Sequence, residues 1–182
     1  EHVTWARQRA FADEWFPDTE LVATSGLVEQ LRAVKDRGEQ ARIEAACAIA
    51  DQALERVRHR LGERPREVDV ALELEWEMGV LGSEGPSFET IVASGPAGAQ
   101  PHHRAGDRVI GEGDLVVIDF GAMVDGYHSD MTRTFAVGEV SATQQRMWDV
   151  VFEAQAAGVA AVAAGTTVEA VDEACREVIR AA

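Results

Sequence analysis

Two aspartates stand at positions where an apolar strand would not ordinarily carry charge. Asp119 follows the apolar run Leu115-Val116-Val117-Ile118, and Asp130 precedes a second strand-like run from Met131 to Val137. Because a buried carboxylate needs a compensating partner, this placement indicates a specific task. Carboxylate oxygens are ligands that hard divalent cations prefer. The two side chains are therefore candidate metal ligands.

The spacing of these aspartates predicts that they share one face of a β-hairpin. Asp125-Gly126 between two strand-like runs is a strong signal for a two-residue turn. Such a turn sets Asp119 opposite Thr132 and makes Asp130 a diagonal neighbour of Asp119 on the same side. With β-carbons about 7 Å or less apart, both carboxylates reach two ions about 3.5 to 4 Å apart. Thr132 is expected to support the carboxylates from the same face.

Two other interpretations of the aspartates stay open. Asp119 can accept hydrogen bonds from turn amides, while Asp130 caps the start of a strand with Arg133 as its counter-ion. A β-bulge in the hairpin would reverse the alternation of side chains and separate the two carboxylates. Spacing alone does not decide among these arrangements.

A loop histidine before the hairpin is a candidate for hydrogen bonding or proton transfer near neutral pH. His102 and His103 follow Pro101 in a loop that begins with the glycine-rich segment Gly95–Gly98. The alternative is an exposed histidine without a chemical role. The glycine-rich segments lack the pattern of a phosphate-binding P-loop, and the Gly-x-Ser-x-Gly motif of serine hydrolases does not occur.

The spacing of apolar residues predicts helices on both sides of a short β region. A helical pattern runs from about Leu27 to Gly62, and a second helix begins near Pro65 and ends near Leu81. Ser141 with Gln144 predicts a capping box for a third helix, and Thr167 caps a fourth. The expected strands are Phe88–Ser94, Leu115–Gly121 and Met131–Val137.

The two predicted helix pairs resemble each other. Gly62 and Val68-Asp69 of the first pair recur as Gly165 and Val171-Asp172 of the second at one constant offset. Short matches between alanine-rich helices also arise by chance, so duplication and coincidence both stay open. A true duplication would place a second copy of the β region beyond Ala182.

Composition excludes several classes of partner. The 182 residues include 32 acidic and 17 basic side chains, and a net charge of −15 repels a nucleic-acid backbone. No apolar run approaches the roughly 18 residues of a membrane span, and the N-terminus lacks a signal-peptide pattern. A soluble cytoplasmic protein is expected. Cys47 and Cys175 are predicted to be buried thiols in a reducing compartment.

The segments that carry these features resemble the Xaa-Pro peptidases, the family of Xaa-Pro dipeptidase (prolidase) and aminopeptidase P. The likeness lies in Ser87–Pro96, Pro101-His102, Gly113–Ala122 and Asp125–Thr134. It implies the pita-bread fold, an α/β (α+β) class in which two related halves surround a metal site and helices flank a mixed or antiparallel sheet.

The resemblance also implies roles for individual residues. The family's metal-binding aspartates match Asp119 and Asp130, and its assisting histidine matches His102, whereas His103 has no role. The expected cofactor is a pair of divalent ions, manganese first, with cobalt or zinc as alternatives. One histidine and two glutamates from the family's second half complete the site, and their positions would lie beyond Ala182. The chain alone is therefore expected to bind metal weakly and not to cleave peptides.

Three segments follow from the same resemblance. Residues 1–25 are expected to be the tail of an N-terminal creatinase-like domain, 26–38 a linker, and 39–182 the first part of the metallopeptidase domain. Since the sequence starts without methionine and stops within an apparent helix, both ends are expected to be cuts in a longer protein.

The implied activity is metal-dependent hydrolysis of the Xaa-Pro bond at the N-terminus of dipeptides or short peptides. The substrate is then a peptide with proline at its second position, and a homodimer is the assembly that the resemblance implies. Two alternatives within the same fold are a metal-free amidinohydrolase like creatinase and a non-catalytic module that binds peptide or protein. The sequence does not separate a dipeptidase from an aminopeptidase P.

Overall fold

The chain divides into two units, Glu1–Gly38 and Glu39–Ala182. The computed structural model describes residues 3–182, so residues 1 and 2 of the predicted first segment lie outside the described part. Among the described residues, no helix combines the length and apolar character needed to cross a membrane. The assignment of residues 1–25 and 26–38 to a preceding domain and a linker stays a prediction.

The first unit consists of short helices joined by turns and extended segments. Thr4 caps α1 (Trp5–Ala10), which continues as the π-helical turn η1 (Phe11–Trp15), and α2 spans Leu27–Ala33. The prediction of a continuous helical stretch from Leu27 into the next helix is wrong at Val34. Val34 adopts an extended conformation and ends α2, so α3 begins separately at Arg37.

Two helices supply one layer of the second unit. After α3 (Arg37–Val57) the chain tightens into the 3₁₀ helix η2 (Arg58–Glu63), and α4 spans Glu67–Val80. The α-helical part therefore ends before Gly62, the residue predicted to end it. The buried side chains of α3 recur every three or four residues, at Ala46, Ala50, Ala53, Leu54 and Val57.

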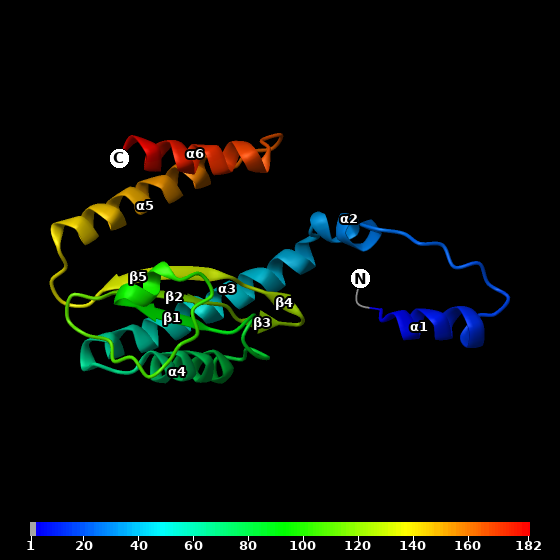
Figure 1. Ribbon diagram of the computed structural model, residues 1–182, viewed down its shortest axis with the longest axis horizontal. Coiled ribbons are helices and arrows are strands. Elements are labelled where there is room, and N and C mark those ends of the chain that lie inside the picture. The colour runs from blue at the N-terminus through cyan, green and yellow to red at the C-terminus, as the bar shows by residue number, and fades with distance from the viewer. Residues whose placement is uncertain (1–2) are drawn as a thin grey trace. The chain divides into compact units, whose positions relative to one another are not determined.

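A three-stranded antiparallel sheet lies against these helices (Figure 1), as predicted. Its strands β1 (Ile91–Ser94), β2 (Leu115–Phe120) and β5 (Met131–Ala136) pair in the order β1-β2-β5. One face of β1 and β2 packs on the helices and contributes to the core, which includes Leu74, Met78, Val92, Val116, Ile118 and Phe120. Each such side chain contributes about 1.5–3 kcal/mol by leaving water.

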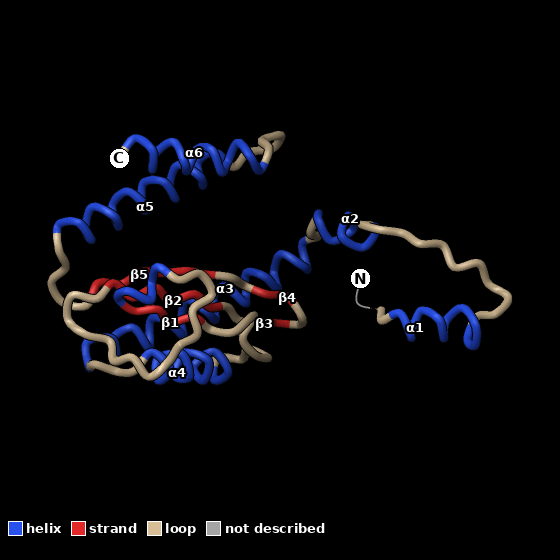
Figure 2. The backbone as a smooth tube through the Cα atoms, viewed as in Figure 1, coloured by secondary structure: helices blue, strands red, loops and turns tan. Residues whose placement is uncertain are grey.

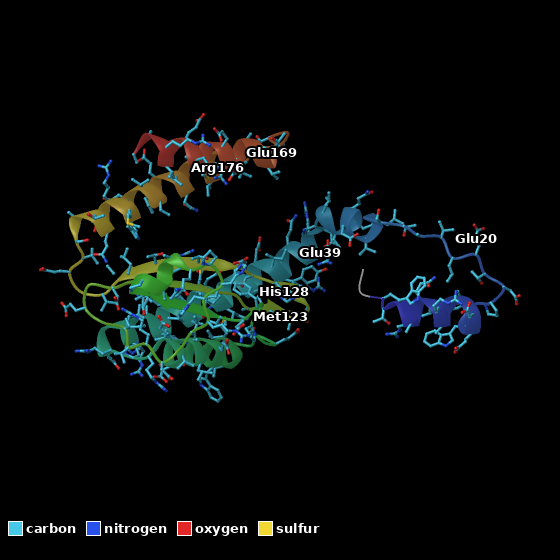
Figure 3. All side chains as sticks on the ribbon, viewed as in Figure 1. Glu20, Glu39, Met123, His128, Glu169 and Arg176 are labelled. Atoms are coloured by element: carbon cyan, nitrogen blue, oxygen red, sulfur yellow. The ribbon has the colours of Figure 1, made fainter. Side chains whose placement is uncertain are left out.

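The hairpin turn has the predicted register. Asp125 and Gly126 both have positive φ, 49° and 74°, between β3 (Met123–Val124) and β4 (Tyr127–His128). The Tyr127 hydroxyl donates a hydrogen bond of 2.9 Å to Glu39 near the start of α3. Figure 3 labels Glu39 together with Met123 and His128, which pair across the hairpin.

The last two helices form an antiparallel hairpin, α5 (Ala142–Ala161) and α6 (Val168–Ala181). The predicted capping box of Ser141 with Gln144 and the Thr167 cap are both confirmed. Gly158 allows the close approach of the helices, because a β-carbon there would lie 2.4 Å from the Cys175 sulfur.

The prediction of two buried thiols is wrong for Cys47, which is exposed, while Cys175 is half-buried. On α3 the buried stripe runs through Ala46 and Ala50. Since successive helical residues are turned by about 100°, Cys47 points away from that stripe.

The loop from β1 to β2 passes around the edge of the sheet (Figure 2). Its first part is the 3₁₀ helix η3 (Gly95–Ala99), where Gly98 lies against the Val117 side chain. Its later part returns to the helical layer, because Glu67 N donates to Arg108 O and Val68 N donates to Gly106 O, both at 3.0 Å. The loop therefore connects the two faces of the sheet.

Candidate active site

The pairing of β2 with β5 places Asp119 beside Thr132, as predicted. The two residues are direct partners in the ladder, and the Thr132 hydroxyl donates a hydrogen bond of 2.9 Å to Asp119 Oδ1. Asp119 is half-buried on the face opposite the apolar core. The hydroxyl fixes one carboxylate oxygen and orients the other.

Asp130 is held at the same end of the sheet by a close approach of two backbone segments. The preceding residue, Ser129, is buried, and its hydroxyl accepts a hydrogen bond of 2.9 Å from Ala122 N. A β-carbon on Gly121 would lie only 1.9 Å from Ser129 O, so this approach requires glycine. Register is unbroken here, since Ser129 N donates to Ala122 O at 2.9 Å. No bulge separates Asp130 from Asp119.

A pocket of about 350 Å³ brings the three predicted chemical residues together. His102 is exposed and has a φ of 57°, a left-handed conformation that is uncommon for residues other than glycine. The residues that line the pocket are Phe88, Glu89, Ile91, His102, His103, Asp119 and Asp130.

The donor set fits a divalent cation in kind. Asp119 and Asp130 offer hard carboxylate oxygens to one pocket, and His102 lines the same pocket as a further polar group. Within residues 3–182, no group of three or more His, Cys, Asp or Glu side chains is placed to hold a metal ion. The described residues thus contribute two carboxylates to this pocket.

A second polar cluster lies next to the pocket, and sequence reasoning missed it. Glu67 is fully buried, and its carboxylate accepts hydrogen bonds from Ser94 N (2.8 Å), Ser94 Oγ (2.6 Å), His103 Nε2 (2.8 Å) and Gly106 N (3.3 Å). Burial raises the pKa of the Glu67 carboxyl, but the bonds from Ser94, His103 and Gly106 together lower it by more, so the net pKa lies below its ordinary value. His103 therefore faces an ionised carboxylate.

A signal for this cluster exists in the helix pattern. Glu67 lies three, four and seven residues before Val70, Ala71 and Leu74, which are all buried. A glutamate on the apolar stripe of a helix indicates a buried carboxylate with partners elsewhere in the chain. The partners themselves are not readable from this spacing.

An ion pair extends the cluster. Arg108 donates to Ser94 Oγ and forms a bidentate pair with Asp114, with distances of 2.7 and 2.9 Å. The Arg108 guanidinium lowers the pKa of the Asp114 carboxyl below its ordinary value. The Ser94 hydroxyl accepts from Arg108 and donates to Glu67, so each group in the cluster has a partner.

Comparisons with known proteins agree on one family. A family model described as metallopeptidase family M24 matches residues 41–182. The Xaa-Pro dipeptidase of Pyrococcus furiosus is 42% identical over 154 residues, which are 85% of this chain and 44% of that protein.

Solved structures give the same result. The Xaa-Pro dipeptidase from Bacillus anthracis has a TM-score of 0.95 and 39% identity, covering 99% of this chain and 50% of that chain. The X-Pro aminopeptidase from Thermotoga maritima MSB8 has a TM-score of 0.92 and 36% identity, covering 98% and 51%. The predicted fold class and the resemblance are confirmed. The chain spans about half the length of the proteins that it matches.

Proposed function

The chain belongs to metallopeptidase family M24, and from this premise we propose that the whole protein hydrolyses the Xaa-Pro bond at the N-terminus of dipeptides or short peptides. The observation that carries the proposal is the pocket in which Asp119, Asp130 and His102 meet. The names of the relatives support the substrate class, since they include Xaa-Pro dipeptidase and X-Pro aminopeptidase.

In this proposal, Asp119 and Asp130 hold two divalent ions, with manganese the first choice and cobalt or zinc as alternatives. When bound, such ions lower the pKa of a water molecule and polarise the scissile carbonyl. The carboxylates fix where this chemistry happens, because the hydroxyl of Thr132 holds Asp119 and the close contact at Gly121 holds Asp130. His102 donates a hydrogen bond to the substrate or to its tetrahedral intermediate.

The 182 residues supply two carboxylates of the proposed ligand set. The family resemblance assigns one further histidine and two glutamates to a second half of the domain. We therefore expect the isolated chain to bind manganese weakly and to leave peptides uncleaved. The homodimer and the cytoplasmic location that the resemblance implies stay predictions.

The test is hydrolysis of Ala-Pro and of a longer peptide with proline at its second position. The whole protein is assayed after chelation, after addition of manganese, cobalt or zinc, and as an Asp119→Ala variant. Metal-dependent cleavage that the variant loses supports the proposal, and the ratio of the two rates separates a dipeptidase from an aminopeptidase. Absence of cleavage with every metal contradicts it.

A further inference from the structure

We propose that Glu67 is a positioning residue for this peptidase reaction: it fixes the loop that carries His102 beside the two carboxylates. The inference rests on the proposed function and extends it to a residue outside the pocket. Glu67 lies in the first turn of α4, on the covered face of the sheet, whereas Asp119 lies on the open face.

The hydrogen bonds of Glu67 end at three places along one loop. Ser94 is the last residue before the loop, His103 lies within the loop, and Gly106 lies where the chain returns to α4. One carboxylate thus ties the beginning, the middle and the end of the segment that contains His102. Cutting these bonds releases the segment at three points together.

Backbone hydrogen bonds hold the far end of this loop. Glu67 N donates to Arg108 O, and Ile110 N donates to Pro65 O at 2.8 Å. These bonds hold the segment 106–110 against the start of α4 without any side chain. Loss of the Glu67 carboxylate should therefore loosen residues 95–105 while the rest of the fold stays in place.

The contact with Glu67 fixes the tautomer of His103. An ionised carboxylate only accepts hydrogen bonds, so His103 Nε2 must carry the hydrogen that it shares with Glu67. This bond fixes the ring of His103 and with it the backbone of its neighbour. His102, held in a left-handed conformation between Pro101 and His103, then has little freedom to turn away from the pocket.

Three variants of the whole protein test the proposal. Glu67→Ala removes every side-chain acceptor, and Glu67→Gln keeps the shape and one oxygen. The glutamine oxygen can accept from Ser94, while its amide donates to a His103 that has shifted its hydrogen to Nδ1. Glu73→Ala is the matched control, because Glu73 lies on the same helix and loses only its 2.9 Å bond from Arg60.

We expect Glu67→Ala to lower kcat for Ala-Pro by about 100-fold, since a catalytic group displaced by about 1 Å has an effect of that size. The kcat of Glu67→Gln should lie within about 10-fold of that of the unaltered protein. Glu73→Ala should leave kcat unchanged. Manganese affinity, measured by calorimetry, should be the same in all four proteins, because Glu67 does not touch Asp119 or Asp130.

A spectroscopic readout in the metal-free protein is independent of activity. Nitrogen-15 spectra of the imidazoles should show a slowly exchanging Nε2 hydrogen on His103 in the unaltered protein and in Glu73→Ala. The Glu67→Gln variant should show the Nδ1 tautomer. A merely structural role would lower the unfolding temperature of Glu67→Ala without altering kcat in folded protein, and that result would overturn the proposal.

If Glu67→Ala fails to fold, the His103→Phe variant tests the positioning role in its place. This variant removes one hydrogen bond to Glu67 and leaves those from Ser94 and Gly106. Its kcat should fall by about 10-fold with unchanged manganese affinity, and an unaltered kcat would contradict the positioning role. Failure of the unaltered protein to cleave any peptide would instead contradict the proposed function, so the two failures are distinguishable.

Discussion

The two faces of the β1-β2-β5 sheet differ although the same strands build them. Along β2, Val116, Ile118 and Phe120 are fully buried against α3 and α4, while the alternate residues Val117 and Asp119 are half-buried on the other side. The covered face fixes where the strands lie. The polar groups on the open face therefore have a fixed spacing. The core side chains on the covered face fix that spacing, although they do not contact the polar groups.

The carboxylates of the two faces show the same division. Glu67, on the covered side, has both oxygens occupied by donors of the protein, so it is closed to ligands. Asp119, on the open side, accepts from Thr132 and lines the pocket. A satisfied carboxylate stabilises a loop, whereas a carboxylate that faces a pocket is available for binding.

Replacing a proposed ligand on the open face should have the largest effect. Asp130→Asn in the whole protein should lower kcat/KM for Ala-Pro by about 1000-fold, since the metal supplies several kcal/mol of stabilisation and each 1.4 kcal/mol is tenfold. The free energy of unfolding should not change. Steady-state kinetics and urea denaturation measure both.

Asp125→Asn is the matched control for that variant. Asp125 lies in the same hairpin, is exposed, and forms a 3.3 Å ion pair with Arg42. Its replacement should leave kcat/KM unaltered. Equal losses in the two variants would show that Asp130 acts through the hairpin as a whole and not as a ligand.

On the covered face, the expected effect is on stability. Phe120→Ala should lower the free energy of unfolding by about 3–5 kcal/mol, because it leaves a cavity where a fully buried ring packs. Leu115→Ala, at a half-buried open-face position of the same strand, should lower it by less. Urea denaturation with equal losses in the two variants would contradict the difference between the faces.

Much of this arrangement follows from local sequence signals. The Asp125-Gly126 turn predicts the register, and the register alone sets Asp119 opposite Thr132, so two of the site's residues could be paired from the sequence alone. The capping signals at Ser141 and Thr167 also act within one helical turn. Such predictions hold because the interacting residues are close in the chain or are joined by one turn.

Longer-range features could not be predicted in the same way. The bond between Glu67 and His103 joins residues from a helix and a loop, and no periodic pattern relates them. The break between α2 and α3 at Val34 has no proline or glycine to mark it. The exposure of Cys47 depends on which face of α3 meets the sheet. Because small apolar residues lie on both sides of that helix, the sequence does not indicate which face is buried.

A smaller effect is expected from the hydroxyl that supports Asp119. Thr132→Val keeps the shape of the side chain and removes the 2.9 Å hydrogen bond, so manganese affinity of the whole protein should fall by about 10- to 100-fold. Thr134→Val, on the same strand and face, is the control and should retain full affinity. Calorimetric titration with manganese measures both, and a parallel loss in Thr134→Val would show a general effect of β5.

The smallest effect should come from the pH dependence of the Glu67 cluster, because burial and hydrogen bonding shift the pKa of its carboxyl in opposite directions. The net pKa in the folded protein lies below the ordinary 4.5, so the unfolded state binds more protons between the two values. The stabilisation is complete above 4.5 and is lost as the pH falls through the folded value.

The charged neighbours of Glu67 also favour a lowered pKa of its carboxyl. His103 faces the carboxylate from the loop, and Arg108 lies beyond Ser94, so both favour the ionised form of Glu67. Thermal unfolding followed between neutral and acid pH should therefore show a steeper loss of stability in the unaltered protein than in Glu67→Gln, which has no proton to bind. If stability fell equally steeply with pH in both proteins, the pKa of the Glu67 carboxyl would be the same in the folded and unfolded chains. That result would contradict the lowered pKa of this carboxyl in the folded protein.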